Sequence, residues 1–171
     1  MPAGNARLDA AVSEQAVRAV LDTVLDPEVP VLSILDLGIV RHVIVHDAHV
    51  TVGLAPTYSG CPATEVIEQS VIDALARAGI RSVSTERVLS PPWTTRWISD
   101  EGRRKLLEYG IAPPTEDHNA KRALLGQDRP RKCPHCDALN TERISEFGST
   151  PCKALYRCTD CREPFEYFKC I

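Results

Sequence analysis

The amino-acid sequence predicts an α/β fold, a small mixed sheet packed with helices, followed by a β zinc-ribbon domain. Apolar patterns typical of helices and strands follow one another as helix, strand, strand, helix, strand over residues 13–89. That order is typical of one sheet covered by helices on one face. Six of the seven cysteines lie after residue 132, which indicates a second structural unit. A chain of 171 residues, 43% of them apolar, is long enough for one well-buried core with a small appendage.

The first predicted elements are a helix and a β-hairpin. Ser13 is suited to cap a helix that ends before Asp26-Pro27. The apolar stripe of this helix has the i, i+3, i+4, i+7 spacing and consists of Val17, Val20, Leu21 and Val24. Apolar alternation then predicts strands over residues 39–45 and 50–54, joined by a turn at Asp47-Ala48.

A second helix and a third strand complete the expected sheet. Pro62 favours the first turn of a helix, and Gly79 ends that helix. Residues 82–89 then form the third strand. Ser99 is suited to cap a further short helix that ends at Tyr109-Gly110.

The sequence divides into three segments. We expect an α/β domain over residues 1–110, a linker over residues 111–131 and a four-cysteine ribbon over residues 132–171. The linker contains residues that interrupt regular structure, namely Pro113, Pro114, Gly126 and Pro130. A flexible linker of this length spans about 25 Å, so the ribbon can approach the α/β domain or a partner.

Composition and charge argue against two classes of protein. A formal net charge of -3 and a pI near 6.0 argue against a nucleic-acid-binding protein. No apolar run reaches the roughly 18 residues that cross a bilayer, and the first residues lack a signal-peptide pattern. We therefore expect a cytoplasmic protein with no membrane partner. In that reducing compartment, cysteines serve as metal ligands or reactive thiols more often than as disulfides.

The strongest chemical signal is a pair of Cys-x-x-Cys motifs. Cys133 and Cys136 are separated by 21 residues from Cys158 and Cys161, and two such motifs can place four thiolates at the corners of a tetrahedron. Zinc fits this ligand set and would stabilise the fold of a small ribbon by joining the two motifs. An iron–sulfur cluster at the same sulfurs is an alternative, and unmetallated thiols are a third. The β segments expected in the ribbon are residues 142–147, 154–156 and 165–168.

Three cysteines lie outside these motifs. Cys152 and Cys170 are either small buried residues or additional thiols that bind or transfer metal. Cys61 directly precedes Pro62, at the start of the second helix, where backbone N–H groups and the helix dipole favour a thiolate. Such a thiolate can bind metal or attack a substrate; a simple helix cap or core filler is the alternative. Hydroxyl groups are concentrated in the same turn, at Thr57, Tyr58 and Ser59.

Two groups of residues other than cysteines are candidate binding features. Three carboxylates could supply oxygen ligands or a partner-binding edge, or could be solvated turn residues: Asp26, Glu28 and Asp36. Two tryptophans with an arginine between them could form an exposed docking surface, because Trp and Arg dominate interface hot spots, or could belong to the core. These residues are Trp93, Arg96 and Trp97.

Motifs along the whole chain resemble a known family. Asp26-Pro27-Glu28, Asp36-Leu37-Gly38 and Thr57-x-x-x-Cys61-Pro62 resemble the SufT-like domain of iron–sulfur assembly factors, over roughly residues 13–90. The segments at residues 56–62, 91–95, 110–114, 147–150 and 152–154 are similar to those of the PaaD family. Members of that family are accessory subunits of the phenylacetyl-CoA ring-epoxidase system.

The resemblance implies an accessory or maturation factor for the phenylacetyl-CoA epoxidase, which supplies or inserts iron or an iron–sulfur cluster into the oxygenase or its reductase. A permanent structural subunit of the epoxidase complex is the alternative, and a nucleic-acid-binding zinc ribbon is a minor one. The chain shows no di-iron helix set and no nucleotide-binding glycine fingerprint, so oxygen activation is expected on another chain. The implied partners are the oxygenase and reductase subunits and the iron–sulfur assembly machinery. The sequence leaves open whether the chain also forms a homo-oligomer.

The resemblance also transfers functional roles to individual residues. Thr57 and Cys61 match the assembly-domain motif, and Asp26 is a weaker candidate. The four ribbon cysteines match the metal ligands of the second domain. We therefore hypothesise that Cys61 is a transient ligand of a metal ion or cluster, and that the ribbon is structural or a docking module.

Overall fold

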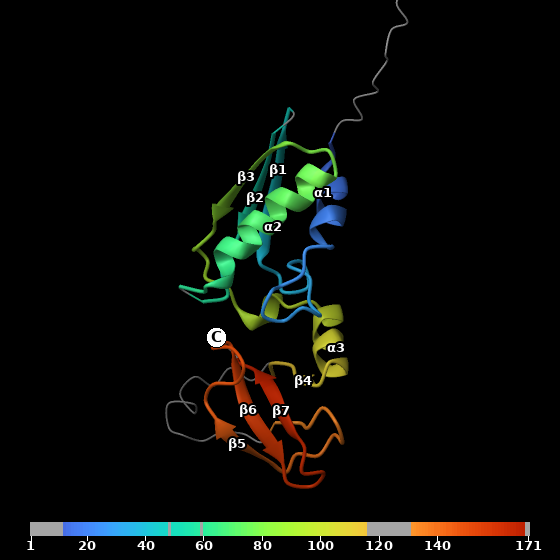
Figure 1. The fold of residues 1–171 in the computed structure, drawn as a ribbon, viewed down its shortest axis with the longest axis vertical. Helices are drawn as coiled ribbons and strands as arrows, with labels where there is room; N and C mark the ends of the chain where they lie inside the picture. Colours follow the sequence, from blue (N-terminus) through green and yellow to red (C-terminus); the bar gives the residue numbers. More distant parts are fainter. Residues whose placement is uncertain (1–11, 48, 59, 116–130, 170–171) are drawn as a thin grey trace, which may run out of the picture.

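The computed structural model describes residues 12–47, 49–58, 60–115 and 131–169. These residues form two sheets and three α-helices (Figure 1), and the predicted fold class is confirmed. The helices and the short 3-10 helix η1 are α1 (Glu14–Leu21), α2 (Ala63–Arg77), η1 (Thr95–Trp97) and α3 (Asp100–Glu108). The strands are β1 (Val40–His46), β2 (His49–Leu54), β3 (Ser82–Arg87), β4 (Ile111–Ala112), β5 (Thr141–Ser145), β6 (Lys153–Cys158) and β7 (Pro164–Phe168). None of the described helices is long and apolar enough to cross a membrane.

The first sheet has the strand order β1-β2-β3. β1 and β2 form the expected antiparallel hairpin, and β3 pairs parallel to β2 after the chain has crossed over through α2. Helices α1 and α2 cover one face of this sheet (Figure 1). Side chains from both layers form the core between them, among them Val17, Leu21, Val43, Val52, Ile67, Val71 and Leu75.

Helix α1 is shorter than its apolar stripe predicts. The Ser13 hydroxyl accepts a hydrogen bond from the Ala16 N–H, as expected of a cap, but the helix ends at Leu21. Val24 N–H then bonds to the Leu21 carbonyl in a tighter turn. Val24 is still buried, so the stripe marks correctly which residues face the core while overstating the length of the helix.

The loop between α1 and β1 is held to α3 by the carboxylate of Asp36. Asp36 Oδ2 accepts a hydrogen bond from Ser33 N (3.1 Å) and lies 2.6 Å from Lys105 Nζ, while Oδ1 accepts one from the Ser99 hydroxyl. Asp36 is buried. The solvated-turn interpretation of this residue is therefore wrong, because its carboxylate is an internal bridge.

Stability at acid pH is expected to depend on Asp36. Burial opposes its ionisation, but the bonds from Lys105, Ser33 and Ser99 outweigh burial and hold the pKa of Asp36 below its ordinary value. A carboxylate whose pKa is lower in the folded than in the unfolded protein stabilises the fold when it is ionised. This stabilisation is complete at neutral pH and is lost as the pH falls below about 4, the ordinary pKa of an aspartate. At neutral pH, Asp36→Asn should cost about 2 kcal/mol.

Urea unfolding of both proteins at neutral pH and in acid measures this effect. The gap between wild type and Asp36→Asn should narrow in acid. Asp73→Asn, which changes an exposed carboxylate on α2, should match wild type at both pH values. A gap that stays constant with pH would contradict the assigned role of Asp36.

The second sheet has the order β4-β7-β6-β5 and includes part of the segment expected to be linker. Ile111 and Ala112 pair with β7 in parallel, and both residues are buried. The chain thus enters the ribbon sheet directly after α3, at residue 111, because β7 offers an edge with which these residues can pair. Most of the remaining linker, residues 116–130, lies outside the described residues.

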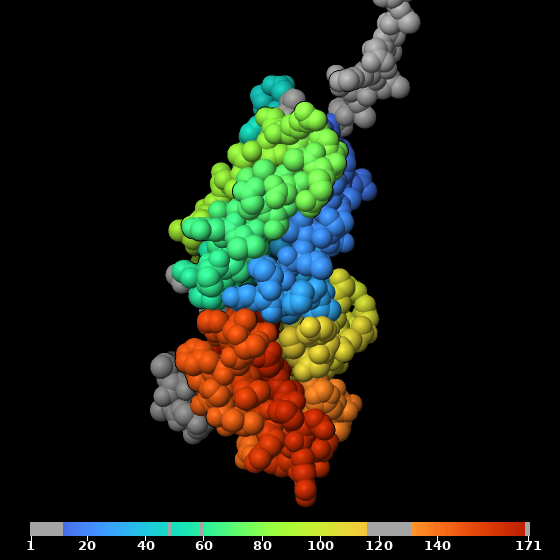
Figure 2. All heavy atoms as spheres, viewed as in Figure 1, coloured from blue at the N-terminus to red at the C-terminus, as the bar shows by residue number. Residues whose placement is uncertain are grey.

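The ribbon packs against the α/β unit through a shared apolar contact. Phe168 of β7 is buried in the first core, with its ring 6.4 Å from that of Trp93. The Trp93 indole N–H donates to the Leu37 carbonyl at 2.9 Å. Figure 2 shows the ribbon atoms lying against the loop after α1 and against α3.

The expected tryptophan docking surface is wrong for Trp93. Its side chain is buried, with 4% exposed, because the ribbon covers it. Trp97 is half-buried, and the Arg41 guanidinium lies 3.4 Å from the centre of its ring. Of the three residues proposed for docking, Arg96 alone is exposed.

Candidate metal centres

The ribbon cysteines form a four-sulfur cluster. Cys133 and Cys136 precede β5, Cys158 ends β6, and Cys161 lies in the turn before β7. Their sulfurs all lie within 4.8 Å of one another, with 3.7 Å from Cys133 to Cys161 and 3.6 Å from Cys136 to Cys158. A tetrahedral zinc ion with Zn–S bonds of about 2.3 Å would hold its sulfurs about 3.8 Å apart. The residues present therefore fit a single metal ion.

Backbone geometry shapes both Cys-x-x-Cys turns in the same way. Asp137 and Arg162, each directly after the second cysteine of its motif, have φ values of 62° and 67°, which turn the chain back around the sulfurs. In the second turn, the backbone N–H groups of Cys161 and Asp160 lower the pKa of Cys158 to about 7. Donors aimed at a thiolate favour the charged form that binds metal.

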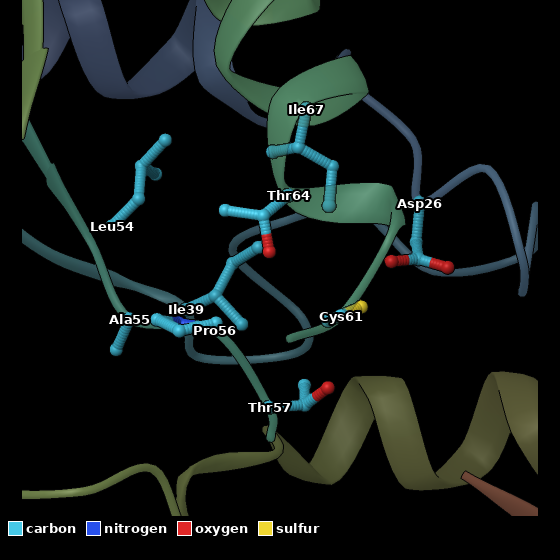
Figure 3. A pocket seen from close by; sticks show the side chains of 9 residues that line it. All are labelled: Asp26, Ile39, Leu54, Ala55, Pro56, Thr57, Cys61, Thr64 and Ile67. Atoms are coloured by element: carbon cyan, nitrogen blue, oxygen red, sulfur yellow. The ribbon is translucent and has the colours of Figure 1, made fainter. Parts of the chain in front are cut away.

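A second candidate site lies in the α/β domain, where one cavity brings together three residues proposed from the sequence. Asp26 follows α1, Thr57 follows β2, and Cys61 precedes α2 (Figure 3). The cavity has a volume of about 20 Å³, which is room for one ion or water molecule. Its remaining lining is largely apolar: Ile39, Leu54, Ala55, Pro56, Thr64 and Ile67.

Asp26 is held at this cavity by the start of its own loop. Its Oδ1 accepts hydrogen bonds from the backbone N–H groups of Glu28 (2.8 Å) and Val29 (2.7 Å). The side chain is buried, so a solvated-turn interpretation is wrong here as well. Burial raises the pKa of Asp26, although the two N–H donors oppose this shift.

Cys61 stands at the N-terminal end of α2 without capping the helix. The N-cap residue is Pro62, and no side-chain hydrogen bond caps the helix. The thiol is half-buried, and Figure 3 shows its sulfur on the side of the cavity where Asp26 lies. The sulfur is thus available to a ligand.

Two further residues, Tyr58 and Cys152, gain importance from the structure. Burial raises the pKa of Tyr58, with the Cys61 thiol beside its hydroxyl as the next cause; the sequence indicated this residue only as one of several hydroxyls. Cys152, whose role the sequence left open, is buried in the first core with its sulfur 3.7 Å from a carboxylate oxygen of Glu28. Cys170 lies outside the described residues.

The four-sulfur cluster lies far from the end of β6 that meets the α/β domain. Cys152 lies directly before β6 and Cys158 is the last residue of that strand, so about 3.3 Å per residue puts them roughly 20 Å apart. The end of β6 that carries the four-sulfur cluster therefore points away from the α/β domain. The opposite end, with Cys152, faces it.

Comparison with known proteins identifies the class of the first domain. Residues 14–85 match the family described as "Iron-sulfur cluster assembly protein". The crystal structure of a DUF59 domain from Bacillus anthracis is similar, with a TM-score of 0.52 and 26% identity, covering 54% of this chain and 90% of that one. A Porphyromonas gingivalis protein named "Fe-S protein maturation auxiliary factor" is 33% identical over 58% of this chain and 92% of its own length. The first domain therefore belongs to the iron–sulfur assembly class by its sequence and its fold.

The second domain and the full-length match identify the family. Residues 117–169 match the model described as "PaaD zinc beta ribbon domain". An Escherichia coli (strain K12) protein, named as a subunit of a putative 1,2-phenylacetyl-CoA epoxidase, is 48% identical over 153 residues, which is 90% of each chain. The chain belongs to the PaaD family of phenylacetyl-CoA epoxidase subunits, and the resemblance seen in its motifs is confirmed.

Proposed function

We propose that this chain matures the phenylacetyl-CoA epoxidase by supplying iron, as an ion or in a cluster, to the oxygenase or its reductase. The observation that carries the proposal is the cavity lined together by Asp26, Thr57 and Cys61. It lies in a domain that matches iron–sulfur assembly proteins, within a chain that is similar over most of its length to a protein named as an epoxidase subunit.

The cavity residues suit a ligand that is bound briefly and then passed on. Cys61 supplies a soft sulfur and Asp26 a carboxylate, and such a mixed pair suits first-row transition metals better than Mg²⁺ or Ca²⁺. Binding displaces the thiol proton to solvent. Because Cys61 is only half-buried, ligands of a partner protein can reach the cargo and replace the sulfur. A cavity of about 20 Å³ favours a single ion as cargo over a cluster.

We infer that the four ribbon cysteines hold zinc as a structural ion. Sulfur separations of 3.6 and 3.7 Å suit one tetrahedral ion, whereas a multi-iron cluster would force the sulfurs further apart. Zinc has no redox chemistry. The role of the four thiolates would therefore be structural: by binding one ion, they would hold the two Cys-x-x-Cys turns together.

Production of the oxygenase and reductase with and without this chain tests the proposal. We expect the partner made without it to lack most of its iron, and the partner made with it to keep its iron after this chain has been removed by gel filtration. Iron per partner chain, measured by elemental analysis, is the readout. Full iron content without this chain would contradict maturation, and activity that requires its stoichiometric presence would instead support a permanent subunit.

A further inference from the structure

A tight turn brings Tyr58 and Cys61 together. The Cys61 N–H bonds to the Tyr58 carbonyl at 3.3 Å, and Gly60 has a φ of 82°. A hydrogen bond from the fourth residue back to the first, with glycine in this conformation at the third, is typical of a β-turn. The Cys61 carbonyl in turn accepts a hydrogen bond from the Thr64 N–H at 3.2 Å. The backbone of the cysteine is therefore held on both sides.

The hydroxyl group of Tyr58 meets the sulfur of Cys61. Tyr58 is half-buried, and its side chain packs against the first core. Its hydroxyl oxygen is buried, and the described residues offer it no oxygen or nitrogen partner. The side chain with which it hydrogen-bonds is that of Cys61. Sulfur is a weak acceptor in a thiol, whereas hydrogen bonds to an ionised acceptor are about twice as strong. The contact therefore favours the thiolate.

The surroundings of Tyr58 keep its hydroxyl protonated. Burial raises the pKa of Tyr58, and the hydrogen bond with Cys61 and the charges of Cys61, Glu28 and Cys152 raise it further. All of these influences disfavour a phenolate. Tyr58 is thus a hydrogen-bond donor to the sulfur and does not compete with it for a metal ion.

We propose that Tyr58 is a positioning residue for metal binding by Cys61. Its hydroxyl donates a hydrogen bond to the sulfur, which orients that sulfur and stabilises it as the thiolate. Hydrogen bonds from groups behind a metal ligand fix its orientation and tune its strength as a donor. On metal binding, the thiol proton goes to solvent and Tyr58 keeps its own. The inference rests on the proposed function, because Cys61 is the proposed ligand of the cargo.

Thr57 and Tyr58 are adjacent hydroxyl residues with different places at the site. Thr57 lines the cavity, so its hydroxyl can face a bound ion directly. Tyr58 does not line the cavity and acts on the ion through the sulfur of Cys61. Loss of the Tyr58 hydroxyl should therefore change how the sulfur binds without removing a ligand.

Anaerobic titration of the full-length, zinc-loaded chain with Co²⁺ tests the proposal. Wild type should bind one cobalt ion beyond the ribbon zinc, with sulfur-to-cobalt absorption from one thiolate. Tyr58→Phe, which removes the hydroxyl and keeps the ring, should weaken this binding by roughly 10- to 100-fold, as loss of an outer hydrogen-bond partner does. Its absorption band should move to longer wavelength, because a sulfur without the hydrogen bond gives up its electrons more easily. Tyr109→Phe, which removes an exposed hydroxyl at the end of α3, should match wild type.

The position of the absorption band separates this role from a merely structural one. Each variant is first shown to retain one zinc and the wild-type far-ultraviolet circular dichroism. Tyr58→Leu, which also lacks the hydroxyl, replaces Tyr58→Phe if the phenylalanine variant fails this check. A folded variant that binds cobalt with an unshifted band would overturn the proposal, as would wild-type affinity or the absence of a second cobalt ion in wild type.

The maturation role is decided by a different measurement, the iron content of the partners. Wild-type cobalt binding by Tyr58→Phe would overturn the role of Tyr58 and leave maturation standing. Partners that fill with iron without this chain would contradict maturation, while the cobalt titration would still decide whether Tyr58 acts on Cys61.

Discussion

Replacement of Cys61 by serine is expected to leave the fold intact and to reduce iron in the partner oxygenase or reductase by about tenfold or more, because the loss of a sulfur ligand weakens binding of the cargo. The sulfur of Cys61 is the one thiol that lines the described cavity, and a serine hydroxyl is a much poorer ligand for a soft metal. The helix behind it does not depend on the thiol, because Pro62 is the N-cap residue. Elemental analysis of partners produced beside the variant measures the effect.

A matched control for this experiment lies in the first turn of the same helix. Glu65 is exposed and does not line the cavity, so Glu65→Gln should support normal iron content. Thermal unfolding of the Cys61→Ser chain should follow that of wild type. Normal iron in partners made with the serine variant would show that Cys61 does not handle the cargo.

Replacement of Cys133 by serine is expected to abolish metal binding by the ribbon and to unfold the C-terminal 40 or so residues. A unit of this size buries too little surface to fold alone, and metal binding contributes about 10–16 kcal/mol in zinc-finger peptides. Cys133 is fully buried in the ribbon core. Loss of the ribbon should also expose Trp93, whose ring lies beside Phe168, and so shift its fluorescence to longer wavelength.

Zinc content, limited proteolysis and tryptophan fluorescence measure this effect together. A strong chelator should give wild type the same fluorescence and protease sensitivity as the variant, and added zinc should restore wild type but not Cys133→Ser. Glu142→Gln, which changes an exposed carboxylate of the ribbon, is the control and should keep its zinc. A Cys133→Ser chain that retains zinc and resists protease would contradict a metal-dependent ribbon.

Local signals in the sequence predicted most of the secondary structure. The Ser13 cap and the apolar stripe of α1 depend on residues three or four positions apart, so they can be read directly from the chain. The same holds for the two Cys-x-x-Cys motifs, because each turn brings its own pair of sulfurs together. Thr57, Cys61 and Asp26 were indicated by local chemistry and then matched by the family resemblance, and these residues line one cavity in the structure.

The sequence by itself thus determined the order of the elements and the four ribbon cysteines, and it indicated Cys61 as a candidate ligand. Tertiary structure alone decided that Trp93 is buried under the ribbon, that Ile111 begins a strand and that Cys152 faces Glu28. Cys152 and Glu28 are 124 residues apart. A contact at such a separation leaves no periodic pattern, because it depends on how two finished units dock and not on the repeat of a helix or strand.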